Sequence, residues 1–339
     1  MNYIETRNSI IRKAAQQKVP VLGEFELSAL CNLKCSMCYV VHQHKPIELT
    51  TKQWKDIFDQ AVASGLLFAL FTGGEIFLRP DFEELYVYLY DLGVRMTLFT
   101  NGTLINERII DILKKRPPEF IAITLYGASN QTYELVTGIK DGFDKVNHGI
   151  NLLKTNKINL VLRTIPLKII NEEIDKIINY VKTKDMMLNY FLYVGPSRDQ
   201  CLSNKDARLT PGELVGFEYK IREAFPQREK ETLTVSKSHA SCVALKSAYF
   251  INHKGEMQAC ALAYMPKASI IDKDLLTTFK DLSTVLTEIE SCSTCASCPV
   301  SSSCIHCYAR RLTEGKYSAC SSYLKEHATL RRNKKYGEV

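Results

Sequence analysis

Short runs of apolar, β-branched and aromatic residues alternate with longer amphipathic stretches along the first part of the chain. Six such runs, each bounded by Gly, Pro, Asn or Asp, lie at residues 23–30, 66–73, 94–100, 120–126, 159–166 and 187–195. Runs of this length and composition predict buried strands, and strands that alternate with helices favour a parallel sheet. The pattern therefore predicts an α/β fold of six strand–helix units, either an open doubly wound sheet or a partial barrel.

The intervening stretches carry apolar residues at the period of a helix. In residues 50–65, a threonine N-cap and Gly65 mark the two ends, and the apolar positions recur three and four residues apart at Trp54, Ile57, Phe58, Ala61 and Val62. Similar stretches lie at 81–93, 106–116, 142–156 and 171–185. In both architectures the functional residues are expected at the carboxyl ends of the strands.

Composition and charge exclude several classes of protein. We find no apolar run long enough to span a bilayer and no signal peptide at the N-terminus, so we expect a cytoplasmic protein without a membrane partner. The net charge of +7 is modest for 339 residues; we interpret the basic stretch 330–339 as a solvated terminus and expect no nucleic-acid partner. In a reducing cytoplasm, the twelve cysteines indicate metal ligation in place of disulfides.

Three of these cysteines, Cys31, Cys35 and Cys38, directly follow the first predicted strand. Three thiolates at this spacing can wrap one side of a compact inorganic cluster, but they leave a four-iron cluster one protein ligand short. A closed zinc site is the alternative, with His42 or His44 as the fourth ligand.

Nine of the twelve cysteines lie at position 201 or later. Their densest pattern is C-x2-C-x5-C-x2-C at Cys295, Cys298, Cys304 and Cys307, followed by Cys320. Upstream, a helix is expected to begin near Thr210, and residues 247–262 predict a hairpin that turns at Lys254 and Gly255. All-thiolate sites suit zinc as well as iron–sulfur clusters, so a zinc-ribbon-like site remains an alternative here.

The spacing C-x3-C-x2-C after a first strand resembles the cluster loop of the radical S-adenosylmethionine (radical SAM) enzymes. The second predicted strand ends in FTGGEIFLRP, which is similar to the GGE motif of that family. The resemblance implies a 4Fe–4S cluster on the three N-terminal cysteines, whose open iron is chelated by the amino and carboxylate groups of S-adenosylmethionine (SAM). It also implies that Gly73 and Gly74 let the backbone approach the cofactor, and that Glu75 accepts a hydrogen bond from its ammonium group.

Further matches to the family follow along the predicted strands. TNGT at 100–103 closes the third strand, and ITLYGAS at 123–129 resembles the family's S-L-D-G stretch, with a tyrosine in place of the aspartate. An arginine on the fifth strand matches one that pairs with the SAM carboxylate. In the family, the position of Met37 is usually aromatic and lies near the adenine. Tyr39, directly after the third cysteine, is expected as a substitute for that aromatic residue. The resemblance thus implies cofactor contacts by Met37, Tyr39, Gly73, Gly74, Glu75, Asn101, Thr124, Arg163 and Leu192.

The C-terminal cysteines resemble those of the SPASM domain, an auxiliary-cluster domain found on many radical SAM enzymes. Cys242, Gly255 and Cys260 match its opening, C-x12-G-x4-C. The resemblance implies one auxiliary 4Fe–4S cluster on Cys295, Cys298, Cys304 and Cys320, and a second on Cys242, Cys260 and Cys307. The second set is one ligand short: either Cys292, Cys201 or His239 completes it, or its iron is left open to bind substrate. Cys201 is also a candidate hydrogen-atom donor.

This resemblance implies a partial (β/α)6 TIM-like barrel followed by a small cysteine-rich auxiliary-cluster domain with a β-hairpin. We expect an N-terminal extension at 1–22, the radical SAM barrel at 23–200, a linker with a helix at 201–240, the SPASM-like domain at 241–325 and a basic tail at 326–339.

The family resemblance implies an enzyme that reductively cleaves SAM to a 5′-deoxyadenosyl radical and abstracts hydrogen from its substrate. We expect a ribosomally made precursor peptide, changed by a crosslink, a thioether or an epimerisation. The alternatives are a radical SAM oxidoreductase or isomerase that acts on a small metabolite, and a non-enzymatic zinc or electron-transfer protein. The other expected partners are an electron donor such as flavodoxin or ferredoxin and a separate leader-binding protein, because only about 22 residues precede the first strand.

Overall fold

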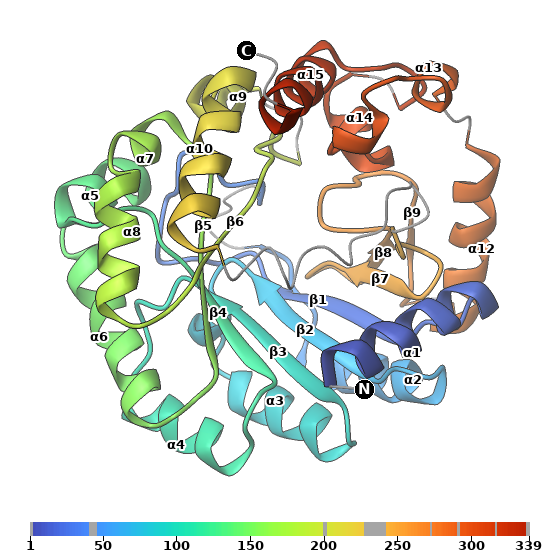
Figure 1. Ribbon diagram of the computed structural model, residues 1–339. Helices are drawn as coiled ribbons and strands as arrows, with labels where there is room; N and C mark the ends of the chain where they lie inside the picture. Colours follow the sequence, from blue (N-terminus) through green and yellow to red (C-terminus); the bar gives the residue numbers. More distant parts are fainter. Residues whose placement is uncertain are drawn as a thin grey trace.

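The computed structural model describes residues 3–40, 46–198, 202–226, 242–271, 273–289, 292–315 and 317–336. A nine-stranded sheet forms its centre, with the strand order β6-β5-β4-β3-β2-β1-β7-β8-β9. Figure 1 shows the helices from α2 to α8 on the outside of the parallel strands, and the C-terminal helices α13 to α15 at the far side of the opening from β3 and α3.

Six consecutive strands run parallel and confirm the predicted α/β architecture. They are β1 (Leu22–Ser28), β2 (Phe68–Gly73), β3 (Arg95–Thr100), β4 (Phe120–Thr124), β5 (Leu160–Thr164) and β6 (Leu188–Tyr190). The last strand is shorter than the apolar run at 187–195. Phe191 is exposed and Leu192 partly buried, whereas residues 193–195 are buried outside the sheet, where Tyr193 donates to the carboxylate of Glu314.

The predicted amphipathic stretches form the helices that cover this sheet. They are α2 (Thr51–Ala63), α3 (Phe82–Asp91), α4 (Glu107–Lys115), α6 (Gly142–Thr155), and the pair α7 (Lys168–Glu172) and α8 (Ile174–Thr183), to which the structure adds η1 (Ile76–Leu78) and α5 (Asn130–Thr137). Helix α2 begins with a capping box between Thr50 and Gln53. Its buried Trp54 and Phe58 pack against Phe25 of β1, with ring centroids 6.1 and 5.2 Å apart.

Side chains alternate across β1, so the neighbours of Phe25 point away from α2. Glu24 and Glu26 therefore lie on the face of the sheet opposite the helix layer. Glu26 is fully buried there, and Glu24 is partly exposed. Two carboxylates on the inner face of a buried strand are unusual and point to a polar barrel interior.

The predicted hairpin extends the barrel sheet. Strand β7 (Ala248–Ile251) pairs in parallel with β1, and β8 (Glu256–Gln258) and β9 (Lys267–Ser269) continue the sheet as antiparallel strands. Gly255, at a φ of 79°, allows the turn between β7 and β8. Helix α1 (Tyr3–Gln17) packs near the start of β1, and α12 (Leu275–Glu288) packs on α2, β8 and β9.

Five further helices and one short turn complete the described chain: α9 (Ser203–Ala207), α10 (Pro211–Ala224), α13 (Ser293–Ala296), η3 (Ser301–Ser303), α14 (Tyr308–Thr313) and α15 (Ser322–Tyr336). Thr210 caps α10, where a helix start was predicted. The described part of the basic end is helical, and residues 330–334 are exposed or partly buried. Helix α15 packs on α10, buries His327 and Ala328, and pairs Arg331 with the buried Glu218 at 2.6 Å. None of the described helices is long and apolar enough to cross a membrane.

Arg331→Leu should lower the free energy of unfolding by about 1–3 kcal/mol, because the buried Glu218 carboxylate loses its closest cation. The matched control is Lys52→Leu, which removes an ion pair from Asp56 that is largely exposed to water and should change stability by at most about 0.5 kcal/mol. Urea unfolding of the two variants, followed by circular dichroism, measures both. Equal effects of the two substitutions would contradict the role given to Arg331.

Candidate functional site

The loop that carries the first three cysteines leaves the carboxyl end of β1 and rests on the end of α5. The amide of Lys34 donates to the carbonyl of Thr137 at 2.8 Å, and that of Ser36 donates to Val136 at 3.1 Å. Leu33, the residue before Lys34, is buried. Cys31, Cys35 and Cys38 are each partly exposed, so backbone hydrogen bonds and one buried leucine hold the loop while its thiols stay accessible.

The thiols of this loop form a donor set that requires a positive partner. Burial, with smaller effects of the negative charges of Glu75 and Cys38, raises the pKa of Cys31 to about 12. Burial also raises the pKa of Cys35 and of Cys38, and the pKa of Cys35 is raised further by its two neighbouring thiolates. At neutral pH these thiols are protonated, and a metal ion that binds them would displace their protons; three neighbouring cysteines fit the protein ligands of an iron–sulfur cluster.

A site for one metal ion, such as zinc, needs its ligands closer together than a 4Fe–4S cluster does. No group of three or more His, Cys, Asp or Glu side chains in the described part of the chain stands in an arrangement that could hold one metal ion. The cysteines of a 4Fe–4S cluster bind separate iron atoms and surround a larger group. His42 and His44, named as zinc ligands in the alternative, lie outside the described residues.

The two glycines of the GGE stretch lie directly against the chain that leaves β1. The amide of Gly74 donates to Ser28 and that of Glu75 donates to Leu30, each at 2.8 Å. A Cβ atom on Gly74 would stand 2.1 Å from the Leu30 carbonyl oxygen, and one on Gly73 would stand 2.4 Å from that of Ser28. Glycine is required here because the end of β2 supports the cysteine loop at backbone contact distance.

Glu75 is fully buried and joins the ends of β2 and β3. Its carboxylate accepts hydrogen bonds from Thr100 Oγ1 at 2.7 Å, the Asn101 amide at 2.8 Å and the Phe77 amide at 3.2 Å. Burial raises its pKa to about 6, although these hydrogen bonds oppose the shift. The contact between Glu75 and the SAM ammonium group stays a prediction, but the structure gives the residue a supporting role that sequence reasoning missed.

The TNGT stretch at the end of β3 holds the cysteine loop from the other side. The side-chain amide of Asn101 donates to Asn32 Oδ1 at 2.9 Å and to Cys31 Sγ at 3.8 Å. Asn32 in turn donates to Thr103 Oγ1 at 2.9 Å. Asn101 was predicted to contact the cofactor, and the structure places it beside a predicted cluster ligand.

Arg163 is a cation without an anion in the described part of the chain. It stands opposite Thr124 in the register of β4 and β5, and its guanidinium lies 3.5 Å from the ring centroid of Phe99 and 5.2 Å from that of Phe191. Its buried Nε has no hydrogen-bond partner among the described residues. Burial lowers its pKa to about 10, so it stays charged at neutral pH. A planar cation held between aromatic rings with free donors fits a carboxylate ligand.

The other residues predicted to contact the cofactor, Met37, Tyr39 and Leu192, have different surroundings. Met37 is 8% exposed, lies in the hydrophobic core, and its carbonyl accepts a hydrogen bond from Asn204. The ring of Tyr39 lies 5.0 Å from the guanidinium of Arg198. Leu192, in the loop after β6, is partly buried against the core. Contact of these residues with the adenine or another part of SAM stays a prediction.

Sequence reasoning missed a buried ionic cluster inside the barrel. Glu26 Oε2 lies 2.6 Å from Arg198 Nη1, and Glu26 Oε1 lies 2.7 Å from His253 Nδ1. Burial would raise the pKa of Glu26, but the charge of Arg198 and the contact with His253 outweigh it and lower the pKa. The cluster joins β1, the loop after β6 and the turn after β7. The acidic pair flanking Phe25 in an otherwise apolar run was the available signal.

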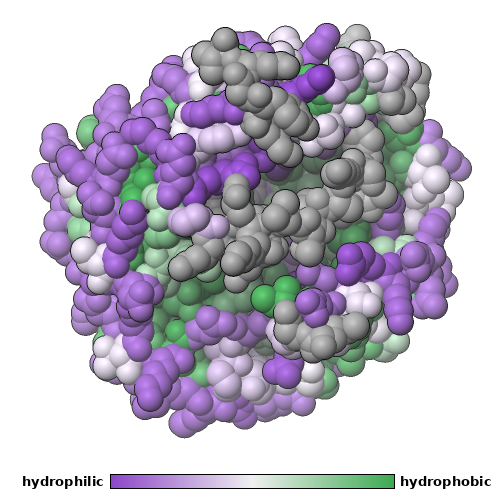
Figure 2. All heavy atoms as spheres, in the orientation of Figure 1, coloured by the Kyte–Doolittle hydropathy of each residue, from purple (hydrophilic) through white to green (hydrophobic). Residues whose placement is uncertain are grey.

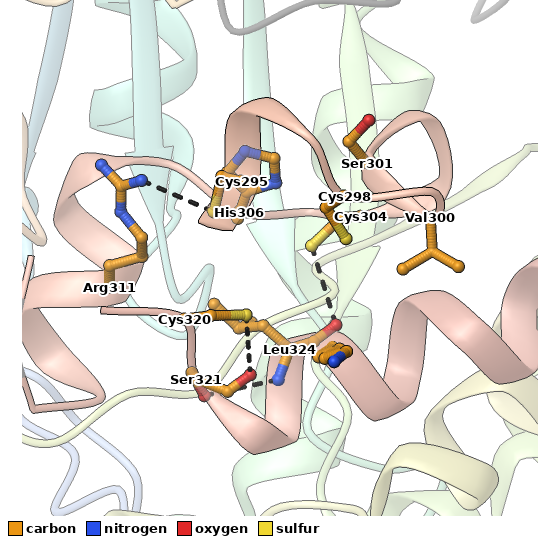
Figure 3. Close-up of a pocket in the computed structure, with 11 residues that line it drawn as sticks. Cys295, Cys298, Val300, Ser301, Cys304, His306, Arg311, Cys320, Ser321 and Leu324 are labelled. Carbon is orange, nitrogen blue, oxygen red and sulfur yellow. Dashed lines mark hydrogen bonds between the residues drawn. The ribbon is translucent and has the colours of Figure 1, made fainter. Parts of the chain in front are cut away.

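Four cysteines line one pocket beneath α15. Cys295, Cys298, Cys304 and Cys320 line this pocket together with His306 and Arg311, among others. Figure 3 shows the sulfur atoms of Cys298 and Cys304 beside each other and the guanidinium of Arg311 reaching Cys295. Arg311 Nη1 lies 3.7 Å from Cys295 Sγ. These are the four residues that the sequence resemblance grouped together.

A second group of thiols lies between the hairpin and α14. Burial, with a smaller effect of the Cys307 thiolate, raises the pKa of Cys242 and raises that of Cys260 to about 12. Cys242 is exposed, and Cys307 caps α14 by accepting from the Arg310 amide at 3.5 Å.

Cys292, one of the residues named to complete the second set, is buried and 2% exposed. Its carbonyl accepts a hydrogen bond from the Cys295 amide at 3.0 Å. Burial opposes its ionisation, but the neighbouring Cys295 and the charge of Arg311 lower its pKa. The other two residues named for that position, Cys201 and His239, lie outside the described residues, as does the proposed hydrogen-donor role of Cys201.

The profile of the radical SAM superfamily matches residues 25–181 of the chain. The AdoMet-dependent heme synthase of Methanosarcina barkeri is 29% identical over 185 residues, which are 54% of this chain and 53% of that protein. The antilisterial bacteriocin subtilosin biosynthesis protein AlbA of Bacillus subtilis is 25% identical over 318 residues, which are 88% of this chain and 69% of AlbA.

The fold is similar to that of Streptococcus suis SuiB, solved with the precursor peptide SuiA bound. The TM-score is 0.73 at 19% identity, over 96% of this chain and 81% of SuiB. The chain spans about half the length of the heme synthase and most of the length of SuiB. Residues 25–181 are therefore similar to the radical SAM superfamily, and the fold is similar to that of SuiB over nearly the whole chain.

Gly74→Ala should lower the free energy of unfolding by about 1–3 kcal/mol, because the new methyl group would overlap the Leu30 carbonyl and push β2 away from the cysteine loop. Urea unfolding of the metal-free protein measures the change. Gly216→Ala is the matched control: it lies inside α10 with no neighbouring atom within 4 Å, and alanine should stabilise it by about 0.5–1 kcal/mol. A stable Gly74→Ala protein would contradict the support role of this contact.

Proposed function

We propose that this protein is a radical SAM enzyme that modifies a ribosomally made precursor peptide. The observation that carries the peptide assignment is the extent of the similarity. The alignment with AlbA covers 88% of the chain and the fold of SuiB covers 96%, so both run through the cysteine-rich C-terminal part. AlbA is named for the biosynthesis of a bacteriocin, and SuiB was solved with a precursor peptide bound. The modification is a crosslink, a thioether or an epimerisation.

In this proposal Cys31, Cys35 and Cys38 hold a 4Fe–4S cluster and leave one iron for the cofactor. Arg163 binds the carboxylate of SAM through its two-pronged guanidinium, which the rings of Phe99 and Phe191 keep in place. When bound, the cluster and SAM supply a carbon radical that removes a hydrogen atom from an unreactive C–H bond. The protein supplies position, since a radical reaction needs the target carbon held close and in line.

Residues around these ligands set their geometry. Glu75 and Asn101 fix the cysteine loop between the ends of β2 and β3, so the thiols keep their places when the cofactor exchanges. Figure 2 shows hydrophilic residues around most of the rim of this face and patches of hydrophobic residues toward its middle.

The C-terminal thiols hold auxiliary iron–sulfur clusters in this proposal. The pocket of Cys295, Cys298, Cys304 and Cys320 supplies four thiolates and closes its cluster. The group of Cys242, Cys260 and Cys307 supplies three among the described residues, so one iron is open to another ligand or to the substrate. An electron donor such as a flavodoxin or ferredoxin and a leader-binding protein would complete the system.

A second candidate function is the modification of a small metabolite. The similarity to the heme synthase of Methanosarcina barkeri favours it, but that similarity covers 54% of the chain. The third possibility, a zinc or electron-transfer protein, needs no cofactor beside Arg163. Anaerobic reconstitution separates it from the enzymes: a colourless protein with stoichiometric zinc that fails to cleave SAM under dithionite would remove both enzymatic functions.

Coexpression with a candidate precursor peptide, followed by mass spectrometry of the peptide, tests the proposal. A crosslink removes the mass of two hydrogen atoms, and an epimerisation leaves the mass unchanged but introduces deuterium from heavy water. Cys31→Ala, Cys35→Ala and Cys38→Ala should each abolish the change, whereas Ser36→Ala, an exposed residue of the same loop, should leave it intact. Modification by any of the three cysteine variants would overturn the mechanism.

Arg163→Gln should weaken SAM binding to the reconstituted protein by about 30- to 150-fold, since loss of one partner of a desolvated charge pair costs about 2–3 kcal/mol. Arg163→Lys should recover part of this loss, because lysine keeps the positive charge but cannot form the two parallel hydrogen bonds of a guanidinium group. Equilibrium dialysis with labelled SAM measures both. Arg95→Gln serves as the control: this arginine lies at the amino end of β3, away from the carboxyl ends of the strands, and also lies over an aromatic ring, that of Tyr3. Unchanged affinity in Arg163→Gln refutes the assignment.

A further inference from the structure

Glu24 is a carboxylate on the inner face of the barrel to which the fold gives no partner. It lies on β1 two residues before Glu26, on the same face of the strand. Glu26 is fully buried and is paired with Arg198 and His253. Glu24 is partly exposed and makes no hydrogen bond or ion pair with the part of the chain that the structure describes. One strand thus presents two carboxylates, and the fold compensates only one of them.

The neighbours of Glu24 in the sheet cannot supply a partner. The register of β1 places it opposite Leu70 of β2 and Phe250 of β7, which are both apolar. The guanidinium of Arg198 lies 5.0 Å from the ring centroid of Phe250, but its Nη1 is held in the ion pair described above and its Nε donates to the Ala261 carbonyl at 3.3 Å. Burial without an opposing cation raises the pKa of Glu24 to about 7. This carboxylate is therefore available to a cationic ligand.

Glu24 lies where the barrel strands meet the C-terminal hairpin. Strand β1 stands between β2 and β7 (Figure 1), and the cysteine loop begins at its carboxyl end. Glu24 is four positions before Ser28, the last residue of β1, a distance of about 13 Å along the strand. About four residues of an extended peptide span this distance. A peptide whose reacting carbon lies beside the cysteine loop can therefore place a neighbouring side chain at Glu24.

Two other polar atoms beside Glu26 are buried without a partner. Arg198 Nη2 and His253 Nε2 have no hydrogen-bond partner among the described residues. Buried polar atoms in this state are rare in folded proteins and point to a missing ligand or water. The Arg198 nitrogen is a donor and suits a carbonyl oxygen, whereas the Glu24 carboxylate suits a cation. A peptide with a basic side chain carries both of these groups.

We propose that Glu24 binds a cationic side chain, lysine or arginine, of the substrate peptide inside the barrel. Glu24 is a binding residue, and no bond forms or breaks at it. This inference rests on the proposed function, because it specifies the substrate of the same site. The net charge of the chain is +7, so the protein as a whole does not attract cations, and a preference for them would come from a local site.

Selection from a random decapeptide library tests the proposal without knowledge of the natural substrate. The full chain is reconstituted anaerobically, immobilised with SAM and exposed to the library, and the bound peptides are identified by mass spectrometry. Peptides that contain lysine or arginine should be enriched about tenfold or more over the input, because a hydrogen bond to a charged group contributes about that factor to affinity.

Glu24→Gln should abolish this enrichment, since the amide keeps the shape of the side chain and loses its charge. Glu119→Gln is the matched control. Glu119 is also a partly exposed glutamate at the amino end of a strand, β4, but it is paired with Arg7 at 3.4 Å. This variant should keep the enrichment of the unmodified protein.

Urea unfolding of the metal-free proteins at about pH 8 separates binding from a structural role. The pKa of Glu24 in the folded protein lies above the ordinary value of a glutamate, so ionisation of this side chain above pH 7 costs stability. Glu24→Gln should therefore unfold at the same urea concentration as the unmodified protein or at a higher one. A lower concentration would show that the carboxylate serves the fold and would contradict the proposal.

Two results of the selection would overturn the inference alone. The first is a lack of enrichment of lysine and arginine by the unmodified protein, and the second is equal enrichment by Glu24→Gln. Neither result changes the coexpression experiment, which tests the proposed function through the modification of a peptide and its loss in the three cysteine variants. The inference and the proposed function can therefore fail separately.

Discussion

Two backbone hydrogen bonds between the end of β2 and the chain that leaves β1 determine where the reactive part of the molecule lies. The amides of Gly74 and Glu75 bond to Ser28 and Leu30, and no side chain larger than hydrogen fits between the two chains. The cysteine loop starts at this contact. Its position therefore follows from the packing of two neighbouring parallel strands, and the buried carboxylate of Glu75 extends the same contact to β3.

Charges inside the barrel fall into two kinds. Glu26 has both a cation and an imidazole as partners, so its charge stabilises the junction of β1 with the loop after β6 and with β7. Arg163 has aromatic rings as neighbours and no anion in the described residues. A buried charge that the fold itself compensates is structural, whereas one that it leaves uncompensated is available to a ligand. This difference separates the supporting residues from the binding residues at one edge of the sheet.

The sequence predicted the features that depend on local pattern. Strand runs, the cap at Thr50 and the cysteine spacings are local, and the structure has the six parallel strands and the cap. The sequence could not predict contacts between distant residues. Glu26 contacts His253, 227 positions later, and β7 pairs with β1 through tertiary packing alone. Whether Cys292, Cys201 or His239 completes the second set stays a prediction, since spacing does not tell which thiols face each other. The ion pair between Arg331 and the buried Glu218 of α10 was likewise not readable from the sequence.

The pairing of β7 with β1 has a consequence for any attempt to divide the chain. Strand β1 has a neighbour on each side, and its second neighbour comes from a segment more than two hundred residues later. A fragment that ended before β7 would expose the hydrogen-bonding groups of β1 as a bare edge and would leave Glu26 without His253. Such an unpaired edge favours aggregation, so the second half of the chain protects the first strand of the sheet.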